Sequence, residues 1–187
     1  MYRYNRKKEI IKNTIYIIFI LLLATIPTYY IYNKFQGVRD VSVNSTLLDV
    51  TYHETTGDRI NLTKVTPVTD SVGLSSKAYN ITVKNNLTEK VNYKVSLFDD
   101  LDKINEDLCQ DSLISTDVIR VSVKASKLGT TIYNLNELEN NVLLFDSLEA
   151  LEKKNISIRV WVKQDSGIPS GSKLHYHGKI KVEEVNE

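Results

Sequence analysis

The sequence predicts a mainly β fold: an antiparallel two-sheet sandwich, Ig-like or jelly-roll-like, preceded by one N-terminal transmembrane helix. Residues 13–33 carry no charge, whereas the segment before them is basic. From residue 38 onward, short runs alternate between apolar and polar residues and are broken by Asn, Asp, Gly and Ser. Such alternation is typical of antiparallel strands with one buried face, and several short strands separated by turns indicate a sandwich.

The uncharged segment is long enough to cross a bilayer, because about 20 helical residues span the ~30 Å hydrocarbon core. Five Lys/Arg residues and a single acid, Glu9, precede it. This balance favours a cytoplasmic N-terminus and an exported C-terminal domain in a single-pass protein of the cell membrane. The residues expected to contact lipid, with tyrosines at the outer interface, are Ile15, Ile17, Leu21, Leu22, Leu23, Tyr29 and Tyr30.

A cleaved secretory signal is the alternative, because it has the same basic start and apolar middle. Its cleavage site needs small residues, and the stretch ATIPTYYIY at 24–32 offers a poor match. We therefore predict a retained signal anchor. The expected organisation is a cytoplasmic basic segment at 1–12, a transmembrane helix at 13–33, a linker at 34–40 and an extracellular sandwich at 41–187.

Period-two runs place the strands of the outer domain at residues 79–83, 91–97, 119–123, 156–162 and 174–182. The first two of these flank Asn85-Asn86, which predicts a hairpin. Two earlier segments, Val38–Val43 and Leu47–Tyr52, could each supply a strand to a neighbouring protein or be the first strands of the sandwich itself.

Two segments depart from this alternation. At 99–111, Leu101, Ile104 and Leu108 recur at helical spacing, which predicts a short helix. Its many acids predict a solvated face rather than a calcium loop, because no central Gly is present; they are Asp99, Asp100, Asp102, Glu106, Asp107 and Asp111. Residues 137–152 are ambiguous, although VLLF at 142–145 suits a strand.

Charge and cysteine content exclude some classes of function. Residues 1–37 hold six of the 24 basic and one of the 23 acidic residues, which leaves 18 basic and 22 acidic residues, a net charge of −4, for the remainder. This acidic balance argues against nucleic-acid binding, which favours clustered basic charge. Cys109 is the only cysteine, so the domain has no internal disulfide; the residue could pair between two chains or simply pack on the short helix.

His175 and His177 are the most suggestive pair for chemistry. Residues i and i+2 on a strand point the same way, so both imidazoles could bind one metal with a third ligand such as His53. They are in phase with Lys179 and Lys181, which predicts instead a solvent-facing pair. No hydrolase, phosphate-binding or zinc-protease motif is present in the sequence. We therefore predict no catalytic residue, no cofactor and no metal, with the histidine pair as the weak metal candidate.

Several segments in a fixed order resemble a known family: KVTPVTDSVG at 64–73, YNITVKNN at 79–86, IRVSVK at 119–124, VLLFDSLEALEKKNISIRVWVKQDSG at 142–167 and GKIKVEE at 178–184. This order resembles the exported β-sandwich proteins of low-GC Gram-positive bacteria akin to camelysin and the TasA-like matrix proteins. The resemblance implies an exported, non-enzymatic sandwich in surface or fibre structure. Those relatives lose their N-terminus at a small-residue site, and this chain has no such site.

The sequence thus predicts a non-enzymatic, membrane-anchored surface protein that contacts the bilayer through 13–33. Its sandwich is expected to bind other surface proteins or to self-associate in envelope or matrix structure. Two alternatives remain: a metal-dependent surface hydrolase using His175 and His177, and a cleaved, secreted matrix subunit.

Overall fold

The computed structural model describes Thr14, Tyr16 and residues 41–44, 47–106, 112–125 and 129–185. The chain divides into two compact units, Met1–Arg39 and Asp40–Glu187, and almost all described residues belong to the second. The predicted anchor residues from Ile15 to Tyr30 lie outside the described residues. Among the residues that are described, no helix is both long and apolar enough to cross a membrane.

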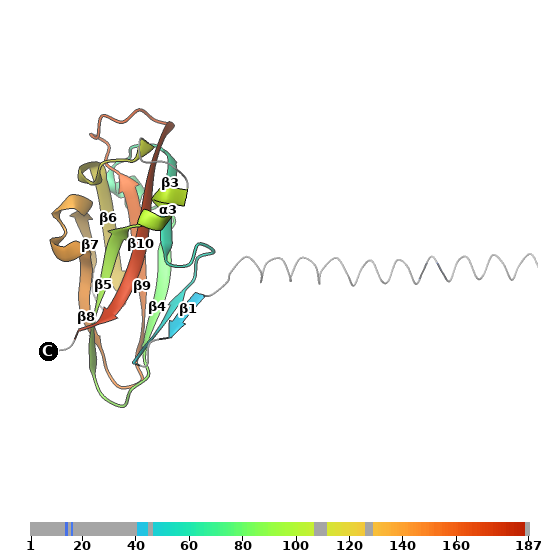
Figure 1. Ribbon diagram of the computed structural model, residues 1–187, viewed down its shortest axis with the longest axis vertical. Coiled ribbons are helices and arrows are strands. Elements are labelled where there is room, and N and C mark those ends of the chain that lie inside the picture. Colours follow the sequence, from blue (N-terminus) through green and yellow to red (C-terminus); the bar gives the residue numbers. More distant parts are fainter. Residues whose placement is uncertain are drawn as a thin grey trace, which may run out of the picture. The chain divides into compact units, whose positions relative to one another are not determined.

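The Asp40–Glu187 unit is built from two antiparallel sheets (Figure 1). Sheet A has the order β1 (Val41–Asn44), β2 (Leu48–Tyr52), β4 (Tyr79–Asn85), β9 (Lys153–Val162), β6 (Ile119–Ala125) and β7 (Thr130–Asn134). Sheet B has the order β3 (Arg59–Val65), β10 (Ser172–Glu184), β5 (Val91–Asp99) and β8 (Val142–Leu148). The predicted mainly β, two-sheet architecture is therefore confirmed.

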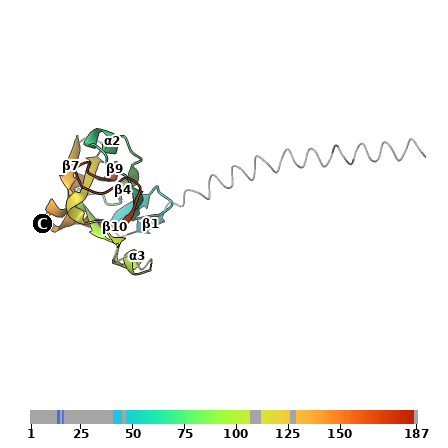
Figure 2. The same cartoon turned by 90° about the horizontal axis from the view of Figure 1, so that it is seen from above.

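Short helices connect or cover the strands. Helix α2 (Asp70–Leu74) and helix α3 (Leu101–Glu106) lie on opposite sides of the sandwich (Figure 2). The 3-10 turns that lie wholly within the described residues are η2 (Thr116–Val118), η3 (Leu135–Glu137) and η4 (Glu139–Asn141). Helix α3 confirms the helical spacing at Leu101 and Ile104. Within the ambiguous segment 137–152, β8 confirms a strand at VLLF, whereas residues 139–141 form η4.

Apolar side chains of the inner faces form the core between the sheets. The alternation in β9 buries Ile156, Ile158, Val160 and Val162, as its sequence predicts. Opposite them, β5 contributes Tyr93 and other buried residues; burial raises the pKa of the Tyr93 hydroxyl well above its usual value, with a smaller contribution from nearby Asp146. Each of these side chains leaves water on folding, at roughly 1.5–3 kcal/mol of stabilisation for a fully buried aliphatic residue.

The first two strands belong to their own sandwich. Val41–Asn44 pairs with β2, and β2 pairs in turn with β4. Because β2 has a neighbour on both sides, its backbone has no open edge. The interpretation of these segments as the first strands of this domain is thus confirmed for the residues that the structure describes.

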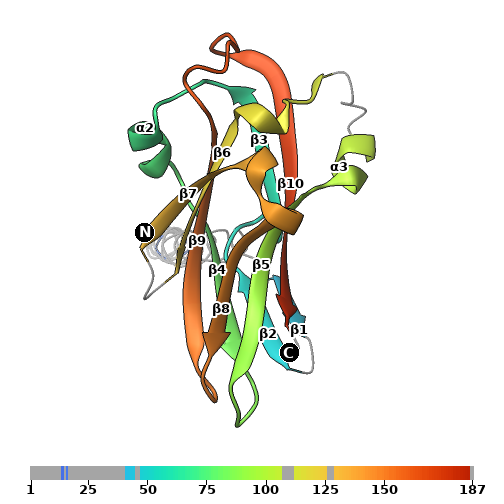
Figure 3. The same cartoon turned by 90° about the vertical axis from the view of Figure 1, so that its left-hand side faces the viewer.

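The predicted hairpin between 79–83 and 91–97 is wrong. Strand β4 pairs with β2 and β9 in sheet A, whereas β5 pairs with β10 and β8 in sheet B. The connection therefore crosses from one sheet to the other, as does the connection from β8 to β9 at the same end of the sandwich (Figure 3). Alternation reports that a segment is a strand, but it does not report which strand is its neighbour.

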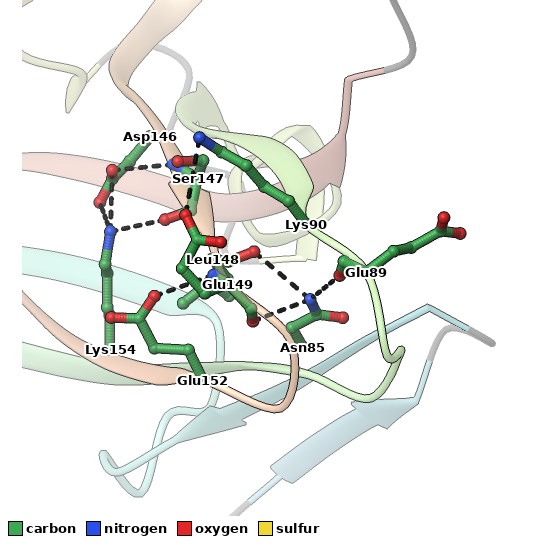
Figure 4. Close-up of polar contacts among 9 residues, drawn as sticks. All are labelled: Asn85, Glu89, Lys90, Asp146, Ser147, Leu148, Glu149, Glu152 and Lys154. Carbon is green, nitrogen blue, oxygen red and sulfur yellow. Dashed lines mark hydrogen bonds and ion pairs between the residues drawn. The ribbon is translucent and has the colours of Figure 1, made fainter.

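A buried amide organises this crossing. The Asn85 side chain is fully buried, and its Oδ1 accepts a hydrogen bond from the Leu87 backbone N–H at 2.8 Å. Its amide nitrogen donates to the carbonyl oxygens of Glu89 at 2.6 Å, Glu149 at 3.0 Å and Leu148 at 3.3 Å (Figure 4). Asn85 thereby joins its own loop in sheet A to the end of β8 in sheet B. A side chain that satisfies buried backbone groups in this way replaces the pairing that a hairpin would supply.

An ion pair, the Lys154 bridge, joins the two sheets beside Asn85. Lys154 Nζ in β9 lies 2.9 and 2.8 Å from the two carboxylate oxygens of Asp146 in β8, and the Tyr93 hydroxyl donates to the same carboxylate at 3.3 Å. Partial burial pushes the Asp146 pKa upward, but hydrogen bonds from Lys154 and the Ser147 N–H outweigh it and hold the pKa below its usual value. The bridge therefore favours ionised Asp146.

Helix α2 is an element that the sequence analysis did not predict. Thr69 is its N-cap and accepts a hydrogen bond from the Val72 N–H at 3.4 Å. The helix packs on Trp161, because a Cβ at Gly73 would overlap the indole ring. Trp161 is on the predicted outer face of β9, yet only 4% of it is exposed. The Thr-Asp pair at 69–70 is a helix-start signal, but five residues are too few for a periodic pattern.

Candidate functional site

The two histidines of β10 share one face, as predicted. In the β3–β10 ladder His175 lies opposite Thr63 and His177 lies opposite Asn61. Their rings stack with centroids 6.0 Å apart and an interplanar angle of 17°. The strand geometry thus brings the two imidazoles together on the outer face of sheet B.

The prediction that this pair faces solvent is wrong for His177, whereas His175 is half-buried. His177 is 2% exposed, and its Nδ1 lies 2.7 Å from Oδ1 of Asn61. Segments far away in the sequence also bond to the backbone here: the His177 carbonyl accepts from the Asp100 N–H at 2.9 Å, and the His175 carbonyl accepts from the Ile114 N–H at 2.8 Å. Period-two alternation identified the outer face but could not show that His177 on this face is buried.

Asp100 is likewise not part of a solvated acidic face. It is 1% exposed, and one carboxylate oxygen lies 2.9 Å from Arg59 Nε while the other accepts from the Lys103 N–H at 3.2 Å. Its carbonyl accepts from the Ile104 N–H, so Asp100 caps the N-terminus of helix α3. By contrast, Asp102 and Glu106 are exposed on that helix, as expected. Asp107, Cys109 and Asp111 lie outside the described residues.

The described residues do not complete a metal centre around the histidine pair. His53, the third ligand considered, belongs to the other side of the sandwich, where its Nε2 lies 2.7 Å from Thr82 Oγ1 in sheet A. Within the part of the chain that the structure describes, no three His, Cys, Asp or Glu side chains are grouped closely enough to hold a metal ion. The geometry around His177 is that of a buried hydrogen-bonding residue.

The free half of strand β10 is a different kind of candidate. Its pairing with β3 ends at Lys179 opposite Arg59, whereas its pairing with β5 continues to Glu184. The Ile180 N–H still donates to the Asp58 carbonyl at 2.7 Å. In an antiparallel ladder, successive residues direct their backbone groups to opposite neighbours. The backbone groups of Val182 and Glu184 therefore point to a side on which no described strand pairs.

A groove of about 660 Å³ lies beside this free edge. Leu48, Val50 and Tyr52 of β2 line one wall, and Ile180 and Val182 of β10 line the other. The Tyr52 hydroxyl crosses between the sheets and donates to the Ile180 carbonyl at 3.4 Å. Burial, together with nearby Asp58, raises the pKa of Tyr52 to about 12. The groove thus combines apolar walls with an unpaired strand edge, which sequence patterning alone could not reveal.

Comparison with known proteins yields no family for this chain. No family model matches it, and no curated protein matches it with significant similarity.

Proposed function

We propose that this chain is a non-enzymatic, membrane-anchored protein whose exported sandwich makes protein–protein contacts at the cell surface. The single observation that carries the contact role is the free half of β10 beside the groove lined by Leu48, Val50 and Tyr52. The uncharged segment at 13–33 and the basic residues before it support the anchor and its orientation.

The contact proposed is strand addition by an extended segment of a neighbouring surface protein. Main-chain hydrogen bonds to an open edge give affinity, and alternate side chains entering a pocket give specificity. The free stretch from Lys181 to Glu184 has four residues and is about 13 Å long at the strand rise. A segment with alternating apolar residues would pair with Val182 and Glu184 and cover the apolar walls.

A photo-crosslinking residue in place of Lys181 tests this contact in intact cells, because Lys181 is exposed and lines the groove. We expect an adduct of discrete mass. Val182→Pro removes the edge N–H that the added strand would use, so it abolishes the adduct. Val182→Thr keeps that N–H and retains the adduct. Strand addition at this edge would be refuted if the two Val182 variants gave equal adducts. It would also be refuted if the chain with the crosslinker at position 181 and natural Val182 gave no adduct.

The N-terminal residue of the mature protein tests the anchor. Met1 or Tyr2 at the start, with the chain in the membrane fraction, is the expected result. A start near Gly37 with the chain in the medium would instead show a cleaved and secreted subunit. This measurement does not depend on the crosslinking result.

A further inference from the structure

The outer face of sheet A carries five cations on three adjacent strands, of which Arg120 in β6 is ion-paired with Asp70. Lys84 in β4, Lys153 and Arg159 in β9, and Lys124 in β6 alternate with buried residues and so point away from the core. The three lysines are exposed, and Arg159 is half-buried, with its Nε donating to the Ser76 carbonyl at 2.9 Å. We call these four residues the basic face.

Two lysines of the basic face lie where their repulsion lowers the stability of the sheet. Lys84 lies directly opposite Lys153 in the β4–β9 ladder, and like charges directly opposite each other destabilise a pair of strands. Asp49 is opposite Lys84 on its other side. Even so, among the described residues no carboxylate comes within ion-pair distance of Lys84, Lys124 or Lys153. Departures from local rules of this kind are expected at functional surfaces.

The positive charge of the basic face is opposite in sign to the net charge of the domain. The chain beyond residue 37 has a net charge of −4, so the basic face is a positive region on an acidic domain. A positive patch on a domain of opposite net charge attracts anions to that face in particular.

An ordered row of neutral polar groups lies between these cations. Ser157 Oγ donates to Asn80 Oδ1 at 2.8 Å, and Thr82 Oγ1 donates to Asn155 Oδ1 at 2.8 Å. Each bond joins β4 to β9 and holds its side chains in one geometry, so little rotamer freedom remains to be lost on binding. The row therefore supplies preorganised hydrogen-bonding groups along the strand.

The dimensions suit a linear ligand. From Lys153 to Arg159 the strand runs about 20 Å at its usual rise. A hollow of about 370 Å³ lies beside this strand, and its lining includes Lys124, Asn155, Ser157 and Arg159. Trp161, which β9 turns toward the same side, lies under α2. It therefore offers no open ring for a base to stack on, as single-stranded nucleic acids require.

We propose that the basic face binds a linear, hydroxyl-bearing polyanion, in the manner of an acidic polysaccharide lying along β9. The cations pair with its carboxylates or phosphates, and the amides and hydroxyls of the row bond to its hydroxyl groups. This inference goes beyond the proposed strand addition, because it uses the opposite sheet and none of the groove residues.

Binding of the full-length chain in neutral-lipid nanodiscs to immobilised polymers tests the inference. Polygalacturonate supplies carboxylates, poly(glycerol phosphate) supplies phosphodiesters, and uncharged dextran and double-stranded DNA are the comparisons. We expect the chain to bind one or both hydroxyl-bearing polyanions, more weakly as salt is raised. The preferred polymer then identifies the anion.

The paired variant Lys84→Gln/Lys153→Gln is expected to weaken that binding about fivefold at low salt, the scale of two exposed ion pairs. A matched control, Lys90→Gln/Lys173→Gln, removes the same charge from exposed lysines elsewhere and is expected to bind normally. Lys84→Arg/Lys153→Arg should also bind normally. The proposal is overturned if neither polyanion binds, if dextran or DNA binds better, or if the control loses as much affinity as the paired variant.

Discussion

Lys153 and Lys154 are neighbours in the chain, and the fold gives them opposite surroundings. Lys154 points into the sandwich, where its ammonium contacts both oxygens of Asp146 and its side chain is 9% exposed. Lys153 points outward and faces another lysine, Lys84, across the ladder. One cation is therefore compensated inside the protein, while the other adds to a surface of its own sign.

This contrast shows how strand parity separates a structural from a surface role. A strand directs successive side chains to opposite faces. Of two consecutive lysines, one therefore points to the inner face and the other to the outer face. The inner lysine must be paired, because an isolated buried charge costs several kcal/mol. The outer lysine is free to respond to what approaches from outside.

Loss of the inner ammonium should produce the largest effect on stability. We expect Lys154→Met to destabilise the domain by about 3 kcal/mol, because it leaves Asp146 beside the core without its partner. Urea unfolding of the full chain in detergent, followed by the fluorescence of the single tryptophan, Trp161, measures this change. Lys153→Met is the matched control and should change stability by less than about 0.5 kcal/mol.

The double variant Lys154→Met/Asp146→Leu tests whether Lys154 and Asp146 act as a coupled ion pair. Removing both charges replaces the pair by apolar contact, so we expect it to be more stable than Lys154→Met alone. If the double variant is as unstable as the sum of the two single variants, the Lys154 bridge does not act as a coupled pair.

Acid should weaken the same bridge by a smaller amount. The folded state lowers the Asp146 pKa, so Asp146 contributes stability above its unfolded pKa of about 3.9, and this contribution is lost as pH falls through the lower folded pKa. We therefore expect the stability difference between the natural chain and Asp146→Asn to be constant near pH 6 and to shrink below about pH 4. A difference that stays the same down to pH 2 would contradict an ionic role for Asp146.

The smallest expected effect is a gain in stability from a substitution on the outer face of sheet A. Lys153→Glu places an acid opposite Lys84 and should stabilise the β4–β9 ladder by about 0.5 kcal/mol. The same change should reduce polyanion binding, so stability and binding would move in opposite directions. Thermal unfolding of Lys153→Glu measures the first effect, and a loss of stability in this variant would show that Lys84 and Lys153 do not repel each other.

Sequence patterning located most strands but not their partners. The alternation of 79–83 and 91–97 correctly identified two strands, yet these strands belong to different sheets because the buried Asn85 amide carries the chain across. For the histidines, the pattern placed both rings on one face, and only the fold revealed that His177 is buried. Partners distant in sequence leave no mark on local periodicity.

The sequence by itself determined the class of fold, most of the strand positions and the uncharged segment at 13–33, because burial period and run length are local properties. Tertiary structure alone decided which strands pair, why Trp161 and His177 are buried, and where an edge of β10 stays open. The register of β4 and β9 also places Lys84 directly opposite Lys153. These features depend on register and on contacts between distant segments, which the order of residues does not state.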